Sequence, residues 1–394
     1  MSIPSNSNTV NAAGGPDLSF GNTTPKDGSV ITTESGGLSR ALSDGSFITA
    51  GVAYIESKRF IAVTKHNPTG ELDTNFGVWY TPTTDFVTLV NLIIQPDGKP
   101  LLLAALGNEQ TAFITRFNSN NGQVDLSFGV NGTTVLDNSL YTVLIPRGGL
   151  AVQADNAIIC VFHDNTDSFI YQLSSSGELT NFGNTEPIKA PNTQLNTMLV
   201  TNSGFVIAGS AARKAHIIGL LHDGQLDSSF GNNGIVELQF SNNNDKQVTA
   251  LAKGQNGQIV VVGGTYTLPP QVNFVASLLA NGQPNSQFHQ GKPLESSTQH
   301  GSYTSVAVQP DRKIVVLARL GVGNLIQLIR HTLAGQLDPT FGTGGVAEAW
   351  RDPQGRPLPS GINFVEWVEP SKTLQSSGIL STTTASFIGR LLSQ

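Results

Sequence analysis

One short motif recurs along most of this 394-residue chain and limits what it can fold into. Its clearest copy is GQLDSSFGNNG at residues 224–234, and its most constant position is a phenylalanine that glycine usually follows. These marker phenylalanines are spaced 48 to 58 residues apart, with a mean of about 54, which is near the length of one β-propeller blade. The markers are Phe20, Phe76, Phe128, Phe182, Phe230, Phe288 and Phe341.

Four short runs typical of β-strands fill each period. One run follows the marker, a second precedes a polar turn, a third follows that turn, and a fourth leads into the next marker, as in GIVELQF, YTSVAVQ, PLLLAAL and AFITRF. No window has a sustained 3.6-residue periodicity, so we expect almost no helix. The pattern predicts an all-β fold, a seven-bladed β-propeller of four-stranded antiparallel blades, with six or eight blades as alternatives.

The two ends of the chain complete each other in this pattern. The last run, SFIGRLLSQ at residues 386–394, has no marker of its own, and GGPDLSFG at residues 14–21 looks like the missing copy. We therefore expect the N-terminal segment to lie beside the last strand and close the ring. Residues 1–13 are predicted to be a disordered tail, and residues 14–394 a single propeller domain, because one blade cannot bury both faces alone.

The repeat resembles the bacterial delta-60 repeat family. The shared pattern is a valine-rich strand, a QPDGKI-type turn, an apolar strand, an FxxxR-type strand and G-x-L-D-x-x-F-G. It is closest in residues 95–129 and 309–342. The fourth copy is one residue short at Thr180 and Asn181, the sixth has Pro284, Asn285 and His289, and the seventh has EPSK. The resemblance implies a β-propeller from a bacterium, in a family of largely unassigned function.

Composition excludes some classes of partner. The net charge is −6 and only 13% of residues are charged, so no basic stripe for nucleic acid is expected. No apolar run approaches the length of a membrane span, and the first residues do not form a secretory signal. We expect a monomer without metal or cofactor that stays in the cytoplasm or is released without a signal peptide. The single cysteine, Cys160, is predicted to be a buried thiol.

The aspartate in each marker copy has two interpretations. A ring of these carboxylates would bind cations, whereas each one singly would accept backbone N–H groups and close an Asx turn. We favour the turn, because the degenerate copies carry Asn or Thr, which serve a turn and weaken a Ca²⁺ site. The marker phenylalanines are predicted to fill the wedges between blades.

Strand alternation separates the connections into two faces. With the strands lettered a to d from the run after each marker, the b-to-c and d-to-a turns are uniform, whereas the a-to-b and c-to-d connections differ from blade to blade. Binding concentrates in such individual loops on a rigid scaffold. The candidate ligand-binding residues on that face are Trp79, Tyr80, Tyr266, His300, Tyr303, Trp350 and Arg351.

Motifs for catalysis do not occur in this chain: there is no H-E-x-x-H, G-x-S-x-G or phosphate-binding loop. The leading hypothesis is therefore a non-catalytic binding module that recognises a protein or a glycan through the a-b/c-d face. The alternative is an enzyme with a site at the propeller axis, a hydrolase or lyase that acts on a carbohydrate or lactone.

Overall fold

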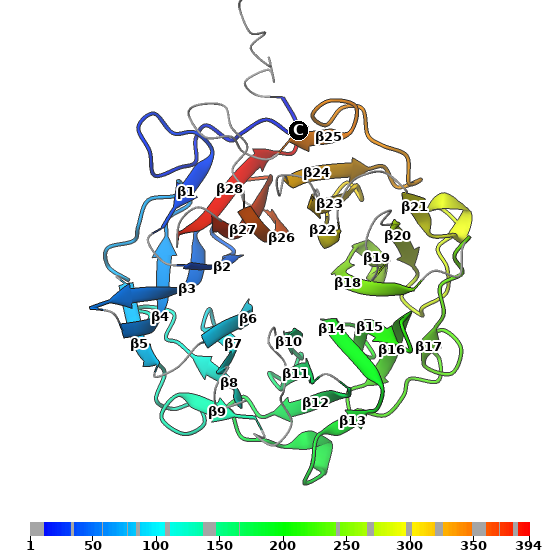
Figure 1. Ribbon diagram of the computed structural model, residues 1–394, viewed down its shortest axis with the longest axis horizontal. Helices are drawn as coiled ribbons and strands as arrows, with labels where there is room; N and C mark the ends of the chain where they lie inside the picture. The colour runs from blue at the N-terminus through cyan, green and yellow to red at the C-terminus, as the bar shows by residue number, and fades with distance from the viewer. Residues whose placement is uncertain are drawn as a thin grey trace, which may run out of the picture.

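Each repeat folds into a four-stranded antiparallel sheet, and seven such sheets stand around a common axis (Figure 1). The computed structural model describes residues 12–32, 35–56, 58–76, 78–83, 87–106, 111–136, 147–164, 166–241, 245–265, 272–296, 302–319, 326–348, 360–369, 371–380 and 385–394. The fold class predicted above, including the number of blades, is confirmed. Most of the predicted tail lies outside the described residues.

The first four blades follow the order of the chain, each from its innermost to its outermost strand. Blade 1 contains β2 (Ser35–Ala41), β3 (Phe47–Ile55), β4 (Lys58–His66) and β5 (Val78–Thr83). Blade 2 contains β6 (Val87–Ile94), β7 (Pro100–Leu106), β8 (Thr111–Arg116) and β9 (Thr133–Val135). Blade 3 contains β10 (Gly148–Val152), β11 (Ile158–His163), β12 (Ser168–Leu173) and β13 (Ile188–Ala190). Blade 4 contains β14 (Thr193–Val200), β15 (Gly204–Ala211), β16 (Lys214–Leu221) and β17 (Ile235–Val236).

The last three blades continue around the ring. Blade 5 contains β18 (Lys246–Lys253), β19 (Ile259–Thr265), β20 (Asn273–Leu278) and β21 (Leu294–Ser296). Blade 6 contains β22 (Tyr303–Val308), β23 (Ile314–Arg319), β24 (Ile326–His331) and β25 (Val346–Glu348). Blade 7 contains β26 (Ser360–Val368), β27 (Thr373–Leu380), β28 (Ser386–Leu392) and the N-terminal strand β1 (Ser29–Ile31).

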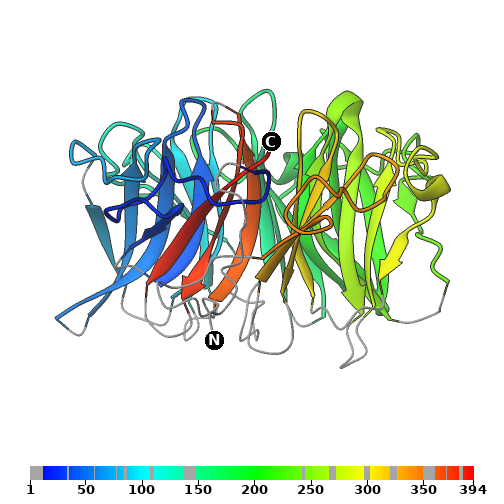
Figure 2. The ribbon, with the colours of Figure 1, turned by 90° about the horizontal axis from the view of Figure 1, so that it is seen from above.

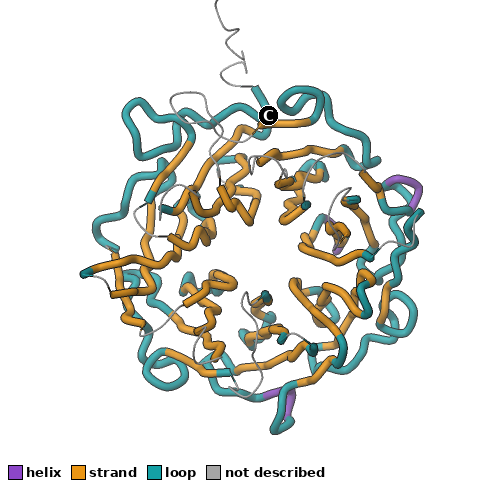
Figure 3. The backbone as a smooth tube through the Cα atoms, in the orientation of Figure 1, coloured by secondary structure: helices purple, strands orange, loops and turns teal. Residues whose placement is uncertain are grey.

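Helix is confined to three 3₁₀ turns in the described part of the chain (Figure 3). These turns are η1 (Asn181–Gly183), η2 (Gln255–Gly257) and η3 (His289–Gly291). None of the helices within the described ranges could cross a membrane.

The ring closes through hydrogen bonds between the two ends of the chain. β1 pairs antiparallel with β28, with Ser29 opposite Gly389. Upstream of β1, the backbone N–H of Asp17 donates to the Arg390 carbonyl at 3.0 Å, and that of Gly14 donates to the Leu392 carbonyl at 2.8 Å. The predicted closure is therefore confirmed, and residues 14–31 supply blade 7 with the outer strand and marker that its own sequence lacks.

Apolar side chains fill the wedge between each pair of neighbouring blades. Seven clusters of buried residues occupy the seven blade interfaces, and six of them contain one fully buried marker phenylalanine. The wedge prediction holds for these six, whereas Phe182 is only partly buried. Cys160 is buried in the cluster between blades 2 and 3, where burial raises its thiol pKa above the usual range, as expected of an unreactive thiol.

One detail of the strand order differs from the prediction. The run after each marker was taken as the first strand of the following blade, but it is the outermost strand of the preceding one: β5 pairs with β4 and not with β6. The reason is that the marker turn reverses the chain against the strand that leads into it. The assignment of the connections to two faces is unaffected, because the strands still alternate in direction.

Candidate functional site

The two faces of the ring carry different kinds of connection (Figure 2). The turn face, as we name it, bears the turns between the first and second strands of each blade and the marker turns. The opposite side, the loop face, bears the connections between the second and third strands and the links between blades. Several of these loop-face connections lie outside the described residues.

Asx turns account for the aspartates of the markers. Oδ1 of Asp125 accepts the Ser127 N–H at 3.1 Å, and Asp227 and Asp338 make the same bond to the residue two positions on, at 3.0 Å each. In the sixth copy the side-chain oxygen of Asn285 replaces the carboxylate and accepts the Gln287 N–H at 3.1 Å. The turn interpretation is therefore confirmed. Within the described ranges, no group of three or more His, Cys, Asp or Glu is arranged to hold a metal ion.

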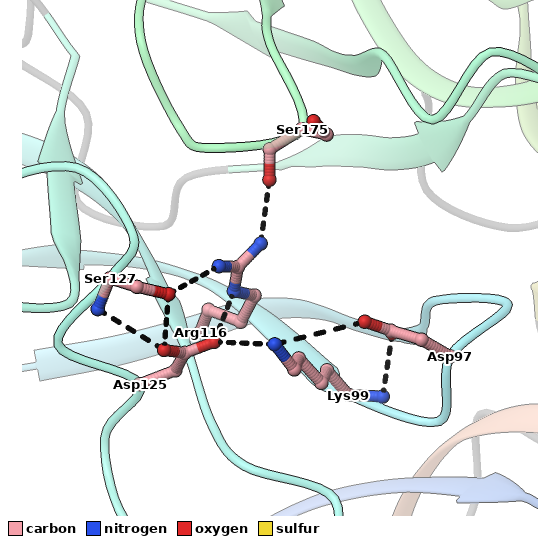
Figure 4. Close-up of polar contacts among 6 residues, drawn as sticks. All are labelled: Asp97, Lys99, Arg116, Asp125, Ser127 and Ser175. Atoms are coloured by element: carbon pink, nitrogen blue, oxygen red, sulfur yellow. Dashed lines mark hydrogen bonds and ion pairs between the residues drawn. The ribbon is translucent and has the colours of Figure 1, made fainter.

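In blades 2 and 6 the marker aspartate also belongs to a buried ion-pair network (Figure 4). Arg116 Nε lies 2.8 Å from Asp125 Oδ2, which Lys99 Nζ approaches to 2.9 Å. The guanidinium stacks over the Phe128 ring, 4.7 Å from its centroid. Burial alone would raise the pKa of Asp125, but bonds from Ser127 and Lys99 and the Arg116 charge hold it well below its usual range. We call Arg116, Asp125 and Lys99 the blade 2 clamp.

The clamp also joins blade 2 to its neighbour. Arg116 Nη1 donates to the Ser175 carbonyl of blade 3 at 2.6 Å. Blade 6 repeats the arrangement, with Arg330 2.8 Å from Asp338, Lys313 3.2 Å from Asp338, and a bond from Arg330 to the Ser393 carbonyl. These are the two repeats in which the sequence pattern was most regular. Their lysine and arginine therefore have structural partners within the fold.

Of the seven candidate ligand-binding residues, only Tyr303 has a side chain in the described part of the structure. Trp79 and Tyr80 lie on β5, with side chains outside the described part of the structure, and Tyr266, His300, Trp350 and Arg351 lie outside the described residues altogether. Tyr303 begins β22 and is only 4% exposed, in the cluster between blades 5 and 6, where burial raises its pKa. Tyr303 thus contributes to packing between blades, and the ligand-binding role of the other six stays a prediction.

The tip of the β3–β4 hairpin is a loop-face feature that the sequence analysis missed. Tyr54 is 54% exposed and Ile55 37% exposed, and the two strands extend beyond the rim of the ring (Figure 1). The Arg59 guanidinium lies 5.5 Å from the centroid of the Tyr54 ring. The available signal was the polar ESKR segment directly after AYI, which marks a hairpin turn with aromatic and aliphatic residues at its edge.

The axis of the ring is lined by the seven innermost strands (Figure 3). Most of their described residues are apolar or uncharged, and many are partly exposed, in contrast to fully buried second strands such as β11 and β19. The described residues of these innermost strands include one carboxylate, Glu366, and no histidine. Arg40 of β2 lies in the neighbouring blade and is partly exposed as well.

Comparisons with known proteins add no functional assignment. No protein-family model matches the chain, and no curated protein matches it in sequence. Among solved structures, a protein from Lactobacillus plantarum is 12% identical with a TM-score of 0.49, over 78% of this chain and 85% of that one. The extracellular domains 1–2 of Drosophila semaphorin 1b are 10% identical with a TM-score of 0.49, over 89% and 87%. The PQQ-bound aldose sugar dehydrogenase of Streptomyces coelicolor is 15% identical with a TM-score of 0.44, over 77% and 94%. These similarities are too distant to assign a role.

Proposed function

We propose that the protein is a non-catalytic binding module that recognises a protein or a glycan through its loop face. The observation that carries the proposal is the exposed tip of the β3–β4 hairpin. Tyr54 and Ile55 present an aromatic and an aliphatic side chain to solvent on the face where connections differ among blades. Exposed aromatic residues with an adjacent arginine are enriched at the energetic centres of protein interfaces, and tyrosine also stacks on sugar rings.

The turn face offers a weaker case for recognition. Its Asx turns repeat around the ring, and in blades 2 and 6 its basic residues are bonded to the marker aspartates. On a face of repeated turns whose side chains bond to one another, few side chains remain available to bind a ligand selectively. Recognition by loops on a rigid ring suits the opposite face better.

The enzyme alternative has one group in its favour. Burial raises the pKa of Glu366 to about 7, against an opposing effect of Arg40, and such a carboxyl titrates where a general acid or base works. Glycoside hydrolysis usually needs a second carboxyl group beside the first. Glu366 is the one carboxylate of the described innermost strands, so we rank binding first.

The test is a binding screen with variants matched for surface chemistry. The wild type, a Tyr54→Ala/Ile55→Ser variant and a Leu126→Ser/Val130→Ser control would be screened on a glycan array and in pull-downs. The control removes apolar residues that are 71% and 79% exposed on the turn face. We expect the hairpin variant to lose ligands that the control retains. If both variants retain the same ligands, the ligand-binding site lies outside the β3–β4 hairpin.

A further inference from the structure

Two charged residues occupy a position on the innermost strands that is aliphatic in the other five blades. In blade 1 the position is Arg40, which pairs with Ile48, and in blade 7 it is Glu366, which pairs with Gln375. The equivalent residues of blades 2 to 6 are Ile93, Ala151, Leu199, Ala252 and Ala307. The two charges therefore lie on neighbouring blades, on either side of the interface between blades 7 and 1.

Arg40 reaches both blades that flank its own. Its Nη2 donates to Asn91 Oδ1 of blade 2 at 3.4 Å, and its guanidinium carbon lies 3.6 Å from the centroid of the Phe364 ring of blade 7. A side chain of an innermost strand that touches both neighbouring blades lies at the axis, where the blades converge. Phe364 and Asn91 thus hold the guanidinium in a fixed plane.

Both Arg40 and Glu366 have hydrogen-bonding groups that form no bond to a described residue. Arg40 has five N–H donors, and its contacts to described residues use two of them, for Asn91 and for the Ser39 carbonyl at 2.8 Å. Glu366 Oε1 accepts the Ala41 N–H at 2.8 Å and Gln375 Nε2 at 3.0 Å, and no described residue bonds to Oε2. None of these contacts joins Arg40 to Glu366.

Arg40 and Glu366 are only partly exposed, and charges that lose much of their contact with water are normally paired with an opposite charge. The pKa values agree with the lack of a close partner. Burial is the main cause that lowers the pKa of Arg40 to about 10 and raises that of Glu366 to about 7, and the attraction between the two groups only partly opposes it. Side chains two residues apart on a strand share a face, so Glu366 lies beside the Phe364 ring on which Arg40 stacks.

We propose that Arg40 and Glu366 form an axial site for a small carboxylic acid that carries a hydroxyl or amino group on the adjacent carbon. The planar guanidinium binds the ligand carboxylate, since its geometry matches two carboxylate oxygens. Oε2 of Glu366 accepts the hydrogen bond of the neighbouring hydroxyl or ammonium group. The site is distinct from the loop face, because both residues lie near the strand ends that lead into turn-face turns.

A chain of hydrogen bonds connects this site to the closing segment. Gln375 donates to Glu366 and to Ser39 Oγ at 2.8 Å, and its Oε1 accepts Arg390 Nε at 2.9 Å. Arg390 in turn donates to the Gly45 carbonyl at 2.7 Å and stacks over Phe20 of the N-terminal segment. A ligand that orders Glu366 therefore also stabilises ring closure, and the melting temperature should rise with ligand concentration.

The experiment is a calorimetric titration of the full chain at constant ionic strength with four probes: L-lactate, glycine, propionate and lactamide. We expect lactate and glycine to bind and to raise the melting temperature. Propionate lacks the donor and should bind several-fold more weakly, and lactamide lacks the carboxylate and should not bind. The Arg40→Gln variant should weaken lactate binding about tenfold to a hundredfold, the range for a lost charge-assisted contact.

Two further variants separate recognition from folding. Arg213→Gln changes an arginine whose side chain is 61% exposed on the loop face, and it should leave lactate affinity unchanged. Glu366→Gln should reduce the preference for lactate over propionate while carboxylate binding persists. Absence of binding by all four probes would overturn the proposal. So would an Arg40→Gln variant that melts earlier but binds lactate as the wild type does, because the pair would then serve closure alone.

Discussion

Blades 2 and 3 close the same turn with different chemistry. In blade 2 the carboxylate of Asp125 accepts the turn N–H, and Arg116 and Lys99 surround it. In blade 3 the equivalent of Arg116 is Gln172, whose Oε1 accepts the Phe182 N–H at 3.1 Å and the Thr180 hydroxyl at 3.0 Å. A neutral amide on the strand thus replaces a charged side chain in the turn.

The difference teaches what the charges do. The turn itself needs only an acceptor, which either side chain supplies. The bond from Arg116 to the Ser175 carbonyl of the next blade is what the charged version adds. The marker phenylalanine of the two turns also differs. Phe128 is fully buried, whereas Phe182 is partly exposed and adopts a positive φ of 57°. We infer that the clamp contributes to blade-to-blade packing more than to the turn.

The largest expected effect concerns the two marker rings. Phe128→Ala should lower the free energy of unfolding by about 3 to 5 kcal/mol, the range for a large buried aromatic residue. Phe182→Ala should cost less than half as much, because its ring is already partly in solvent. Urea unfolding of the two variants measures the difference. Equal losses would mean that the shortened fourth marker packs as tightly as the others.

The second effect concerns the counter-ion of the clamp. Asp125→Ala leaves Arg116 buried without its carboxylate, so we expect a loss of about 3 kcal/mol. The matched change in blade 3, Thr180→Ala, removes one exposed hydroxyl bond and should cost under about 1 kcal/mol. A loss for Asp125→Ala as small as that for Thr180→Ala would show that Ser127 and Ser175 alone satisfy the guanidinium.

Lowering the pH should weaken the marker turns that contain an ionised aspartate, but not the uncharged marker turn of blade 3. The folded pKa of Asp338 is about 2, against an ordinary value of 3.8: burial opposes the lowering, and bonds from Thr340 and the Arg330 charge outweigh it. This carboxylate therefore stabilises the fold fully above about pH 5, and the contribution is lost as the pH falls from about 4 to 2. The difference in melting temperature between the wild type and Asp338→Asn should shrink from pH 7 to pH 3. A constant difference would contradict an ionised, bonded Asp338.

The smallest change in the free energy of unfolding is expected when the blade 2 clamp residues are introduced into blade 3. A Gln172→Arg/Thr180→Asp variant gives blade 3 the charges of blade 2 at a more exposed position, where an ion pair contributes at most about 1 kcal/mol. Urea unfolding should therefore place this variant within about 1 kcal/mol of the wild type. A larger gain would mean that the charged clamp is generally stabilising and that blade 3 lacks it for another reason.

The sequence predicted the ring because its evidence is local and repeated. Each marker carries its own turn chemistry, and the positions of Phe20 and the last strand indicated closure. The assignment of the run after each marker to a blade could not be read in this way, since either neighbouring strand can pair with a short β-rich run.

Arg40 and Glu366 were missed for a related reason. Their equivalence depends on strand register, and their proximity joins residues from opposite ends of the chain. The marker aspartates, by contrast, were interpreted correctly because an Asx turn involves only neighbours in sequence.

The shared seventh blade has a consequence for synthesis on the ribosome. Ser29 must wait for its partner Gly389, which is translated about 360 residues later. At about 5 to 20 residues per second this interval lasts roughly 20 to 70 s. During that time six blades can assemble while the first strand keeps its backbone groups unpaired. An unpaired strand of this kind pairs readily with other chains, so newly made copies on one messenger should exchange it most readily when translation is slow.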